Sequence, residues 1–313
     1  DVVSDATVTM IEPLSKEGII LTSGILPRYS DIDTYDMAAS ILDLAIRRVI
    51  AVGGKLGHIA GLDNFCWPDP VQSEKTPDGE YKLAQLVRAN QGLYDYTKRF
   101  RVPLISGKDS MKNDSTRGGR KISIPPTVLL SAISKMDDIS KAVTLDFKHA
   151  GDYIYAIGNT SAELGGSEYF AMLDATGNNV PKVDAEYAMK IYDAVSSATE
   201  AELVSALTTP ALGGFGVALA KMAVGGRLGA KVDWALVPGA EGLATAEIMF
   251  SESNSRFLAA VAPEKAEAFE KCLAGVPFAK IGTVTSEQTL VWNDGSVAVD
   301  ALTDAYKSTL AGL

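Results

Sequence analysis

Hydrophobic and polar positions follow helix and strand periods along the first half of the chain. Between residues 36 and 52 apolar side chains recur every three to four positions, which predicts an amphipathic helix that Asp33 or Thr34 can cap. A second long helix is predicted over residues 81–100. Short apolar runs predict strands at residues 7–10, 18–21, 58–65, 103–105 and 127–133, with a loop at 23–30 and a mobile loop at 113–121.

The second half continues the same alternation of strands and helices. Strands are predicted at residues 153–157, 256–262 and 279–284, and a hairpin at 290–292 and 296–299. Helices are predicted at residues 184–199, 200–207, 214–224, 263–274 and 300–310. Strands mixed with long helices in both halves predict an α/β (α+β) chain of two domains, residues 1–148 and 149–313.

The net charge and the composition limit the classes of function that this chain can have. The net charge of −10 argues against non-specific nucleic-acid binding, which needs a basic face, but leaves nucleotide binding open. No apolar run approaches the length of a membrane span, and the distant Cys66 and Cys272 predict neither a disulfide framework nor a zinc site. We therefore expect a cytoplasmic protein without membrane contact. Because the chain opens at Asp1 without an initiator methionine, we also expect a piece of a longer protein.

One polar cluster stands out after the strand predicted at 103–105. Gly107 breaks the apolar run, and Lys108, Asp109 and Ser110 follow it directly. Glycine lets a backbone approach a phosphate, while lysine, carboxylate and hydroxyl groups suit a phosphate or Mg²⁺. Asp63 and Asn64 lie in the strand predicted at 58–65, so they join this cluster if the two strands are neighbours. The alternative is a polar loop beside an edge strand.

Other polar segments have simpler explanations. The glycine-rich segments 164–168 and 213–214 could bind an anion at a helix start, but chain turning accounts for them as well. The serine-rich segment 251–255 reads as a turn. His58 and His149 have no neighbouring nucleophile pattern, so we assign neither to catalysis.

Four motifs occur together in a characteristic order. They are Leu-Asp-Asn-Phe-Cys-Trp-Pro-Asp-Pro at 62–70, Pro-Leu-Ile-Ser-Gly-Lys-Asp-Ser-Met at 103–111, Leu-Gly-Gly-Ser-Glu-Tyr at 164–169 and Gly-Gly-Phe-Gly-Val-Ala-Leu-Ala-Lys-Met at 213–222. With these motifs the whole chain resembles the C-terminal half of the phosphoribosylformylglycinamidine synthases, which belong to the aminoimidazole ribonucleotide synthetase superfamily.

The resemblance implies a reaction and partners. These enzymes convert formylglycinamide ribonucleotide to formylglycinamidine ribonucleotide with ATP, Mg²⁺ and glutamine-derived ammonia, in purine biosynthesis. The implied partners are a catalytic N-terminal half, which pairs with this unit as a pseudo-dimer, and a glutaminase unit. The family's histidine-bearing catalytic segment has no counterpart here, so no catalytic residue is assigned. By motif position, Gly107 matches a nucleotide contact and Ser110 a substrate contact, whereas Lys108 replaces a metal-binding asparagine.

A second departure concerns the metal–nucleotide site that related C-terminal units can carry. In those units a Glu and an Asn from one helix and an Asp before a later helix form the site. The matching positions in this chain are Leu44, Arg48 and Leu212. Leucine cannot ligate Mg²⁺ and arginine repels it, so we predict that this unit has lost its own site. Asp5, near a matching carboxylate, would be a relic.

The leading hypothesis is a non-catalytic half that braces the catalytic half and completes its active site. The alternatives are an assembly scaffold without any active-site contribution, and a stand-alone kinase similar to thiamine-phosphate kinase. The missing carboxylates argue against the kinase. The isolated chain could also form a homodimer through the surface left by the missing half.

Overall fold

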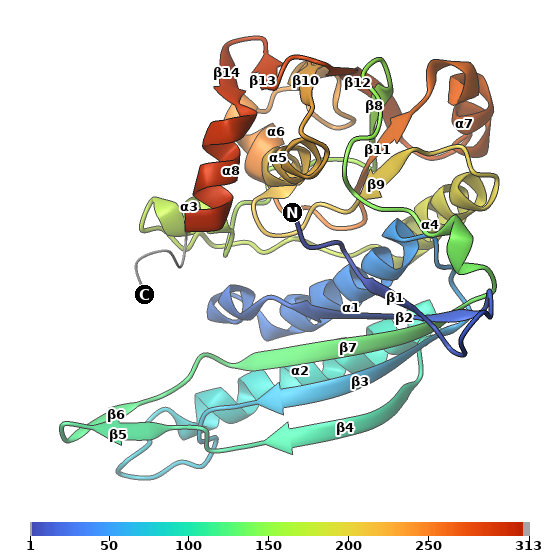
Figure 1. Cartoon of the computed structure of the whole chain (residues 1–313). Coiled ribbons are helices and arrows are strands. Elements are labelled where there is room, and N and C mark those ends of the chain that lie inside the picture. Colours follow the sequence, from blue (N-terminus) through green and yellow to red (C-terminus); the bar gives the residue numbers. More distant parts are fainter. Residues whose placement is uncertain (1, 309–313) are drawn as a thin grey trace.

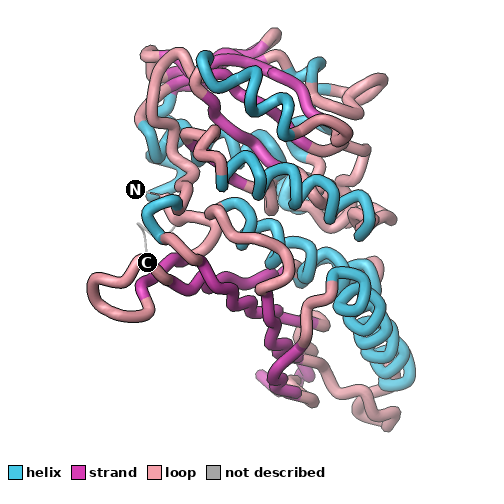
Figure 2. The backbone as a smooth tube through the Cα atoms, turned by 90° about the vertical axis from the view of Figure 1, so that its right-hand side faces the viewer, coloured by secondary structure: helices cyan, strands magenta, loops and turns pink. Residues whose placement is uncertain are grey.

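A computed structural model describes residues 2–308, and within them two sheets pack with helices between and around them (Figure 1). One sheet has five strands in the order β1-β2-β7-β3-β4, and the other has seven in the order β14-β13-β10-β12-β8-β11-β9. Figure 2 shows helices in the layer between the two sheets. The predicted α/β class is confirmed.

The first part of the chain builds the five-stranded sheet and a small hairpin. Its elements are β1 (Thr7–Met10), β2 (Gly18–Ile25), α1 (Thr34–Ala51), β3 (Ile59–Cys66), α2 (Gly79–Phe100), β4 (Leu104–Ser110), β5 (Ser115–Arg117), β6 (Arg120–Ile122) and β7 (Thr127–Met136). The predicted cap of α1 is confirmed, because the Asp33 side chain accepts hydrogen bonds from the N–H groups of Tyr35 and Asp36. These donors precede the first helical hydrogen bonds and would otherwise lack a partner.

Helices cover one face of the five-stranded sheet and leave the other open. Ile20, Leu130 and Ala132 are buried on the helix side, whereas Leu21 is 43% exposed and Ile133 is 37% exposed. Side chains along a strand alternate between faces, so the exposed residues share the outer face. We call it the open face; its apolar members are Ile19, Leu21, Ile25, Ala60, Leu62, Leu129 and Ile133.

The second part of the chain builds the seven-stranded sheet. Its elements are β8 (Tyr153–Ile157), α3 (Glu168–Met172), α4 (Ala185–Glu200), β9 (Ala206–Thr208), α5 (Gly214–Gly226), β10 (Gly229–Val232), α6 (Thr245–Phe250), β11 (Phe257–Val261), α7 (Ala266–Cys272), β12 (Phe278–Thr285), β13 (Thr289–Trp292), β14 (Gly295–Ala298) and α8 (Val299–Ser308). β11 is buried at every position, because α5 and its neighbours cover one face of this sheet and α4 and α7 the other. A continuous apolar run is typical of a strand covered on both sides.

Three sequence expectations for local structure are wrong. The helix predicted at 200–207 is not formed beyond α4; instead β9 pairs antiparallel with β11, with Ala206 opposite Ala260. The loop predicted from residue 23 begins later, because β2 continues to Ile25 beside β7. The segment expected to be a mobile loop at 113–121 contains the β5–β6 hairpin. The last helix was predicted to reach Leu310, which lies outside the described residues.

One hydrophobic core joins the two sheets. It contains the inner face of the five-stranded sheet, nearly all of α1, and one side of α4 together with Phe257 and Phe269. α1 is buried along its length because both sheets pack around it. An apolar interface of this extent holds the two sheets in one fixed arrangement.

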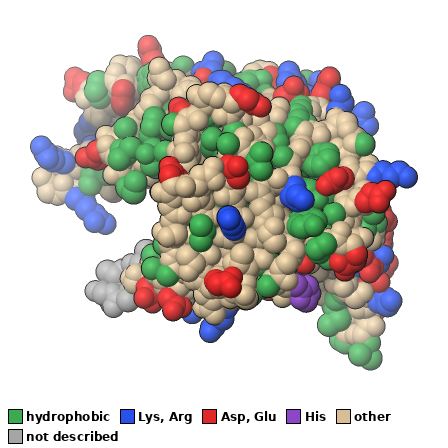
Figure 3. Space-filling model, turned by 90° about the horizontal axis from the view of Figure 1, so that it is seen from above, with side chains coloured by type: hydrophobic (Ala, Val, Ile, Leu, Met, Phe, Trp, Pro, Cys, Tyr) green, Lys and Arg blue, Asp and Glu red, His purple; other side chains and the backbone are tan. Residues whose placement is uncertain are grey.

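The surface does not gather charge of one sign on the face seen from above. Lys and Arg side chains are interspersed there with Asp and Glu, and hydrophobic patches lie between them (Figure 3). Across the described residues, the helices are too short or too polar to cross a bilayer.

Candidate functional site

The two strands that carry the predicted site residues are neighbours. β3 and β4 run parallel, and their register places Asp63 beside Gly107 and Asn64 beside Lys108. The sequence had left this pairing open. The predicted loop after Gly107 is wrong, however, because β4 continues to Ser110 and remains paired with β3.

The expected burial of this strand is also wrong. β4 ends the sheet, and Ile105 is 66% exposed where a buried position was predicted. Its apolar residues lie at an uncovered edge of the sheet. An edge strand at this place was part of the alternative interpretation of the sequence.

Strand alternation divides the predicted cluster between two faces. The open face carries Asn64, Lys108 and Ser110, and the helix side carries Asp63, Gly107 and Asp109. A Cβ atom at Gly107 would lie 3.0 Å from Asp63 Oδ1, which confirms that these two residues share a face. Strand geometry therefore separates the six residues into two groups of different chemistry.

The open-face group combines a cation, a hydroxyl and an amide. Lys108 Nζ donates to Ser110 Oγ at 2.5 Å, so the ammonium and hydroxyl groups lie side by side and can contact the same ligand. Asn64 Oδ1 is buried and has no hydrogen-bond partner among the described residues. The ammonium of Lys108 and the hydroxyl of Ser110 can donate to a phosphate or hydroxyl-bearing ligand presented by a molecule that covers the open face, and Asn64 Oδ1 can only accept.

One member of the helix-side group, Asp63, borders a shallow cavity of about 600 Å³ beneath α2. Asp63 lines it together with Tyr94, Lys98 and Arg101. Partial burial raises the pKa of Asp63, and the neighbouring charge of Asp109 raises it further. This carboxylate faces away from Lys108 and Ser110, so the two groups cannot bind the same small ligand.

Ion pairs fix the chain that follows β4. Lys121 Nζ lies 3.0 Å from Asp114 and 3.9 Å from Asp69, and Lys112 Nζ lies 3.6 Å from Asp69. The Val71 N–H and these two lysines lower the pKa of Asp69. Asp69, from the motif at 62–70, therefore anchors the base of the β5–β6 hairpin.

The positions that match the metal–nucleotide site do not fit a divalent cation. Leu44 is buried in the core and Leu212 is 44% exposed, and neither offers an oxygen ligand. Arg48 places a guanidinium there, with Nη1 donating to the Ser23 carbonyl at 2.6 Å. Within residues 2–308 no group of His, Cys, Asp or Glu is arranged to hold a metal ion.

Asp5 remains beside this arginine as a half-buried carboxylate. It accepts a hydrogen bond from Thr208 Oγ1 at 2.8 Å, and it lines a cavity of about 500 Å³ with Arg48 and Lys221. Burial raises the pKa of Asp5, while Thr208, Lys221 and Arg48 oppose that rise. Cationic side chains thus face Asp5 at the place where a metal-binding site would need further acidic ligands.

The two glycine-rich loops both face an internal anion. Glu252 Oε1 accepts the Gly213 N–H at 2.8 Å and the Glu168 N–H at 3.0 Å, and its Oε2 accepts the Tyr29 hydroxyl at 2.8 Å. Burial raises the pKa of Glu252, whereas these hydrogen bonds lower it. The backbone amides that the sequence offered as ligand sites therefore bind the chain's own carboxylate.

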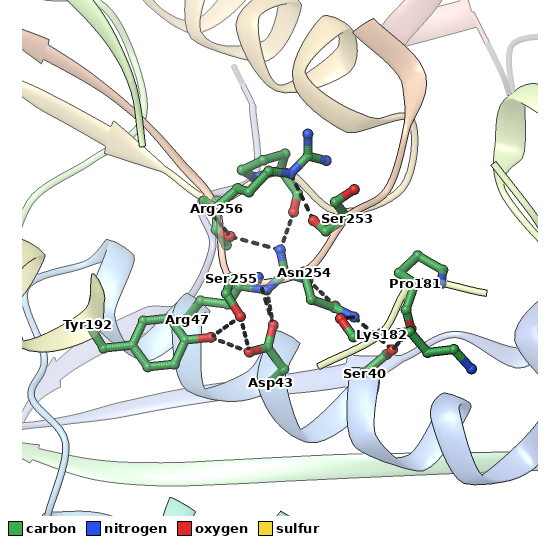
Figure 4. Close-up of polar contacts among 12 residues, drawn as sticks. Ser40, Asp43, Arg47, Pro181, Lys182, Tyr192, Ser253, Asn254, Ser255 and Arg256 are labelled. Carbon is green, nitrogen blue, oxygen red and sulfur yellow. Dashed lines mark hydrogen bonds and ion pairs between the residues drawn. The ribbon is translucent and has the colours of Figure 1, made fainter. Parts of the chain in front are cut away.

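The segment after Glu252 forms a buried polar network with α1 (Figure 4). Asp43 lies 2.7 Å from Arg47 Nε and accepts the Ser255 N–H at 3.1 Å and its hydroxyl at 2.8 Å. Tyr192 also donates to Asp43. Burial and the charge of Asp43 raise the pKa of Tyr192, so it stays a hydroxyl donor.

Further contacts tie the same network to both halves of the chain. Arg47 donates to Thr209, to Asn254 and to the carbonyl of Pro210. The sequence missed this network, because segment 251–255 read as a turn. The available signal was a charged pair, Asp43 and Arg47, four residues apart on the apolar stripe of a helix.

Comparison with known proteins identifies the family. Residues 4–133 match the family described as "AIR synthase related protein, N-terminal domain", and residues 149–293 match "AIR synthase related protein, C-terminal domain". The chain is 31% identical over 299 residues to phosphoribosylformylglycinamidine synthase subunit PurL of Alkaliphilus metalliredigens, which covers 95% of this chain and 38% of that protein. The corresponding protein of Thermococcus sibiricus is 30% identical over 297 residues, covering 95% of this chain and 39% of its own length.

Solved structures share the fold. Thermotoga maritima PurL, in a complex with FGAR, superposes with a TM-score of 0.76 at 21% identity, covering 95% of this chain and 47% of the other. Thiamine monophosphate kinase of Aquifex aeolicus superposes with a TM-score of 0.63 at 13% identity, covering 94% and 92%. The chain spans about two fifths of the length of its curated relatives. Its two matched domains and these relatives show that it belongs to the AIR synthase related family.

Proposed function

We propose that this chain is the second, non-catalytic unit of a phosphoribosylformylglycinamidine synthase, divided into domains at residues 1–148 and 149–313. It would brace a catalytic unit and add side chains to that unit's active site in the ATP- and glutamine-dependent conversion of formylglycinamide ribonucleotide. The observation that carries this proposal is the position of Asn64, Lys108 and Ser110 on the open face, where a covering partner would meet them.

The proposed occupant of the open face is the catalytic half of the same enzyme. The apolar centre of the open face includes Leu21 and Ile133, both more than a third exposed. The polar group of this face lies at the end of β3 and β4. An apolar centre beside polar groups is typical of a stable protein interface. The relatives, more than twice as long as this chain, supply the additional sequence that such a partner requires. A glutaminase unit would dock elsewhere on the assembled enzyme.

We further propose that this unit holds no metal–nucleotide complex of its own. Arg48 and Lys221 face Asp5, and Leu44 and Leu212 supply no ligand. ATP and Mg²⁺ would then act in the catalytic unit alone. The same residues argue against a stand-alone kinase, which needs carboxylates to hold Mg²⁺ near the phosphates.

The decisive experiment changes Ser110 to Ala in the intact synthase. Loss of a hydrogen bond to bound substrate lowers kcat/KM about tenfold or more. Ser106→Ala, on the same face of β4 and four residues earlier, is the matched control and should leave kinetics unchanged. Light scattering checks that both variants assemble.

The outcomes separate the two leading functions. Normal kinetics of Ser110→Ala with normal assembly would favour a scaffold that adds nothing to the active site. ATP-dependent turnover by this chain alone, without a catalytic unit, would refute the non-catalytic assignment.

A further inference from the structure

The β5–β6 hairpin forms a two-stranded sheet of its own beside the two larger sheets. Figure 1 shows that it extends beyond the ends of β3 and β4. Because β4 ends at Ser110, the hairpin follows closely on the polar group of the open face. Its two-residue turn consists of Gly118 and Gly119, both with positive φ, as the favoured hairpin turns require.

One face of the hairpin is tied to the body of the protein. Lys121 Nζ lies 3.0 Å from Asp114 and donates to Thr76 Oγ1 at 2.6 Å. Thr116 is the cross-strand partner of Lys121, so it lies on the same face. These contacts fix the direction in which the hairpin leaves the sheet, so a ligand need not order it.

The opposite face carries two arginines. The register pairs Arg117 with Arg120 and Ser115 with Ile122, and side chains alternate along each strand, so these four residues share one face. We call it the arginine face. Both arginines are exposed, and within residues 2–308 neither guanidinium has a hydrogen-bond or ion-pair partner. Ile122 is 49% exposed beside them, so the whole arginine face is uncovered.

The pairing of Arg117 with Arg120 weakens the hairpin unless an anion is present. Like charges directly opposite each other in a strand pair are destabilising. The Cβ atoms of such a pair lie about 4.5–5.5 Å apart, so both guanidinium groups can reach one anion. The segment that leads to the hairpin adds to the attraction, because residues 98–121 contain eight Lys or Arg and two Asp in a chain of net charge −10.

A phosphate monoester is the anion that suits two adjacent guanidinium groups. At pH 7 it carries about 1.5–2 negative charges and three oxygens that accept hydrogen bonds from arginine. A protein partner would need two carboxylates side by side, and these repel each other. The phosphates of MgATP suit the arginines less well, because the metal ion already neutralises their charge.

We propose that Arg117 and Arg120 bind the phosphate group of formylglycinamide ribonucleotide while the catalytic unit holds the rest of that substrate. This inference rests on the proposed function, because the hairpin extends away from its own chain and the ligand must be held by the unit that covers the open face. The two arginines bind the substrate and take no part in the chemical step. The KM for the ribonucleotide should therefore depend on them, whereas kcat should not.

The test changes both arginines to Gln in the intact synthase. The KM for formylglycinamide ribonucleotide should rise about tenfold or more, because charge-assisted hydrogen bonds are lost, while kcat and the KM for ATP stay unchanged. Lysine at both positions keeps the charge without the fork and should recover part of the loss. The control, Lys190→Gln with Lys271→Gln, removes the same charge from exposed positions in α4 and α7 and should have no effect.

A ligand without the phosphate separates phosphate binding from a structural role. Formylglycinamide riboside, used as substrate or competitive inhibitor, should bind the parent and the Gln variant equally. The melting temperature of the variant should be unchanged or slightly higher, since the like-charge repulsion is gone. Equal losses with riboside and ribonucleotide, or a raised KM for ATP alone, would overturn the proposal. Weakened assembly with a normal KM would indicate an acidic protein partner and would also overturn it.

The same measurements separate this proposal from the proposed function. An unchanged KM in the Gln variant, together with impaired kinetics of Ser110→Ala, would overturn the role of the arginines alone. Normal kinetics of both variants would overturn that role and also the active-site contribution of this unit.

Discussion

Removing the carboxylate of Asp43 should destabilise the whole unit severely. Asp43 is fully buried and contacts Arg47, Ser255 and Tyr192, and Arg47 itself is 1% exposed. Asp43→Ala leaves the Arg47 charge buried without its counterion and leaves two hydroxyl groups short of an acceptor. Breaking one side of a buried ion pair costs about 3–5 kcal/mol, a large share of the 5–15 kcal/mol that stabilises a typical domain.

The assay is denaturant unfolding followed by fluorescence and circular dichroism together. The loss in free energy of unfolding is the shift in midpoint multiplied by the slope. Glu200→Ala, which breaks only the exposed Lys55–Glu200 pair, is the control and should cost less than about 1 kcal/mol.

A double variant separates the charge from the volume of the side chains. Asp43→Leu with Arg47→Met removes both charges, so it should recover most of the stability that Asp43→Ala loses. The reasoning fails if Asp43→Ala costs less than about 1 kcal/mol. It also fails if the double variant loses as much stability as Asp43→Leu and Arg47→Met lose together when each is made alone.

Two further predictions concern the five-stranded sheet. Gly24→Ala should destabilise the protein by about 1–3 kcal/mol or more, because the new Cβ would lie 2.1 Å from the Ile41 carbonyl oxygen of α1, while Ser23→Ala on the outer side should be nearly neutral in the same unfolding measurement. Asp63 has a raised pKa in the folded protein, so its contribution to stability is present at acid pH and lost as the pH rises through that pKa. Asp63→Asn should therefore be more stable than the parent at pH 7 and equal to it near pH 3; a constant difference in melting temperature across that range would contradict this.

The sequence predicted most of the elements because their periods are local properties. β1 and the helix α1 follow directly from apolar spacing and the Asp33 cap. β9 was mistaken for a helix because three residues carry no readable period, and only pairing with β11 makes them a strand.

The sequence proposed the residues of the candidate site but not their arrangement. The motifs singled out Asp63 and Gly107 but left open whether their strands are neighbours, and a loop was expected where β4 continues. Whether a polar run is a loop or an edge strand depends on the adjacent strand, which lies about forty residues earlier in the chain. The face of the sheet that Asp63 or Lys108 occupies follows only from the register in which β3 and β4 pair.

The contacts of the buried anion Glu252 and of the Asp43 network were missed for another reason, although the spacing of Asp43 and Arg47 on α1 was a readable signal. Their partners come from segments far apart, as with Tyr29 and Glu252. No local pattern reports that such groups meet, and polar residues in a turn are usually solvated.

β4 ends its sheet, so along residues 2–308 one row of its backbone N–H and C=O groups has no partner strand. Beside it lies the apolar open face, and together they form a template on which other newly made chains can add strands. In the proposed synthase, a covering unit made on the same polypeptide would reach millimolar effective concentration as soon as both units emerge. Carrying the two proposed units on one polypeptide would thus protect the second from aggregation, in addition to matching their numbers.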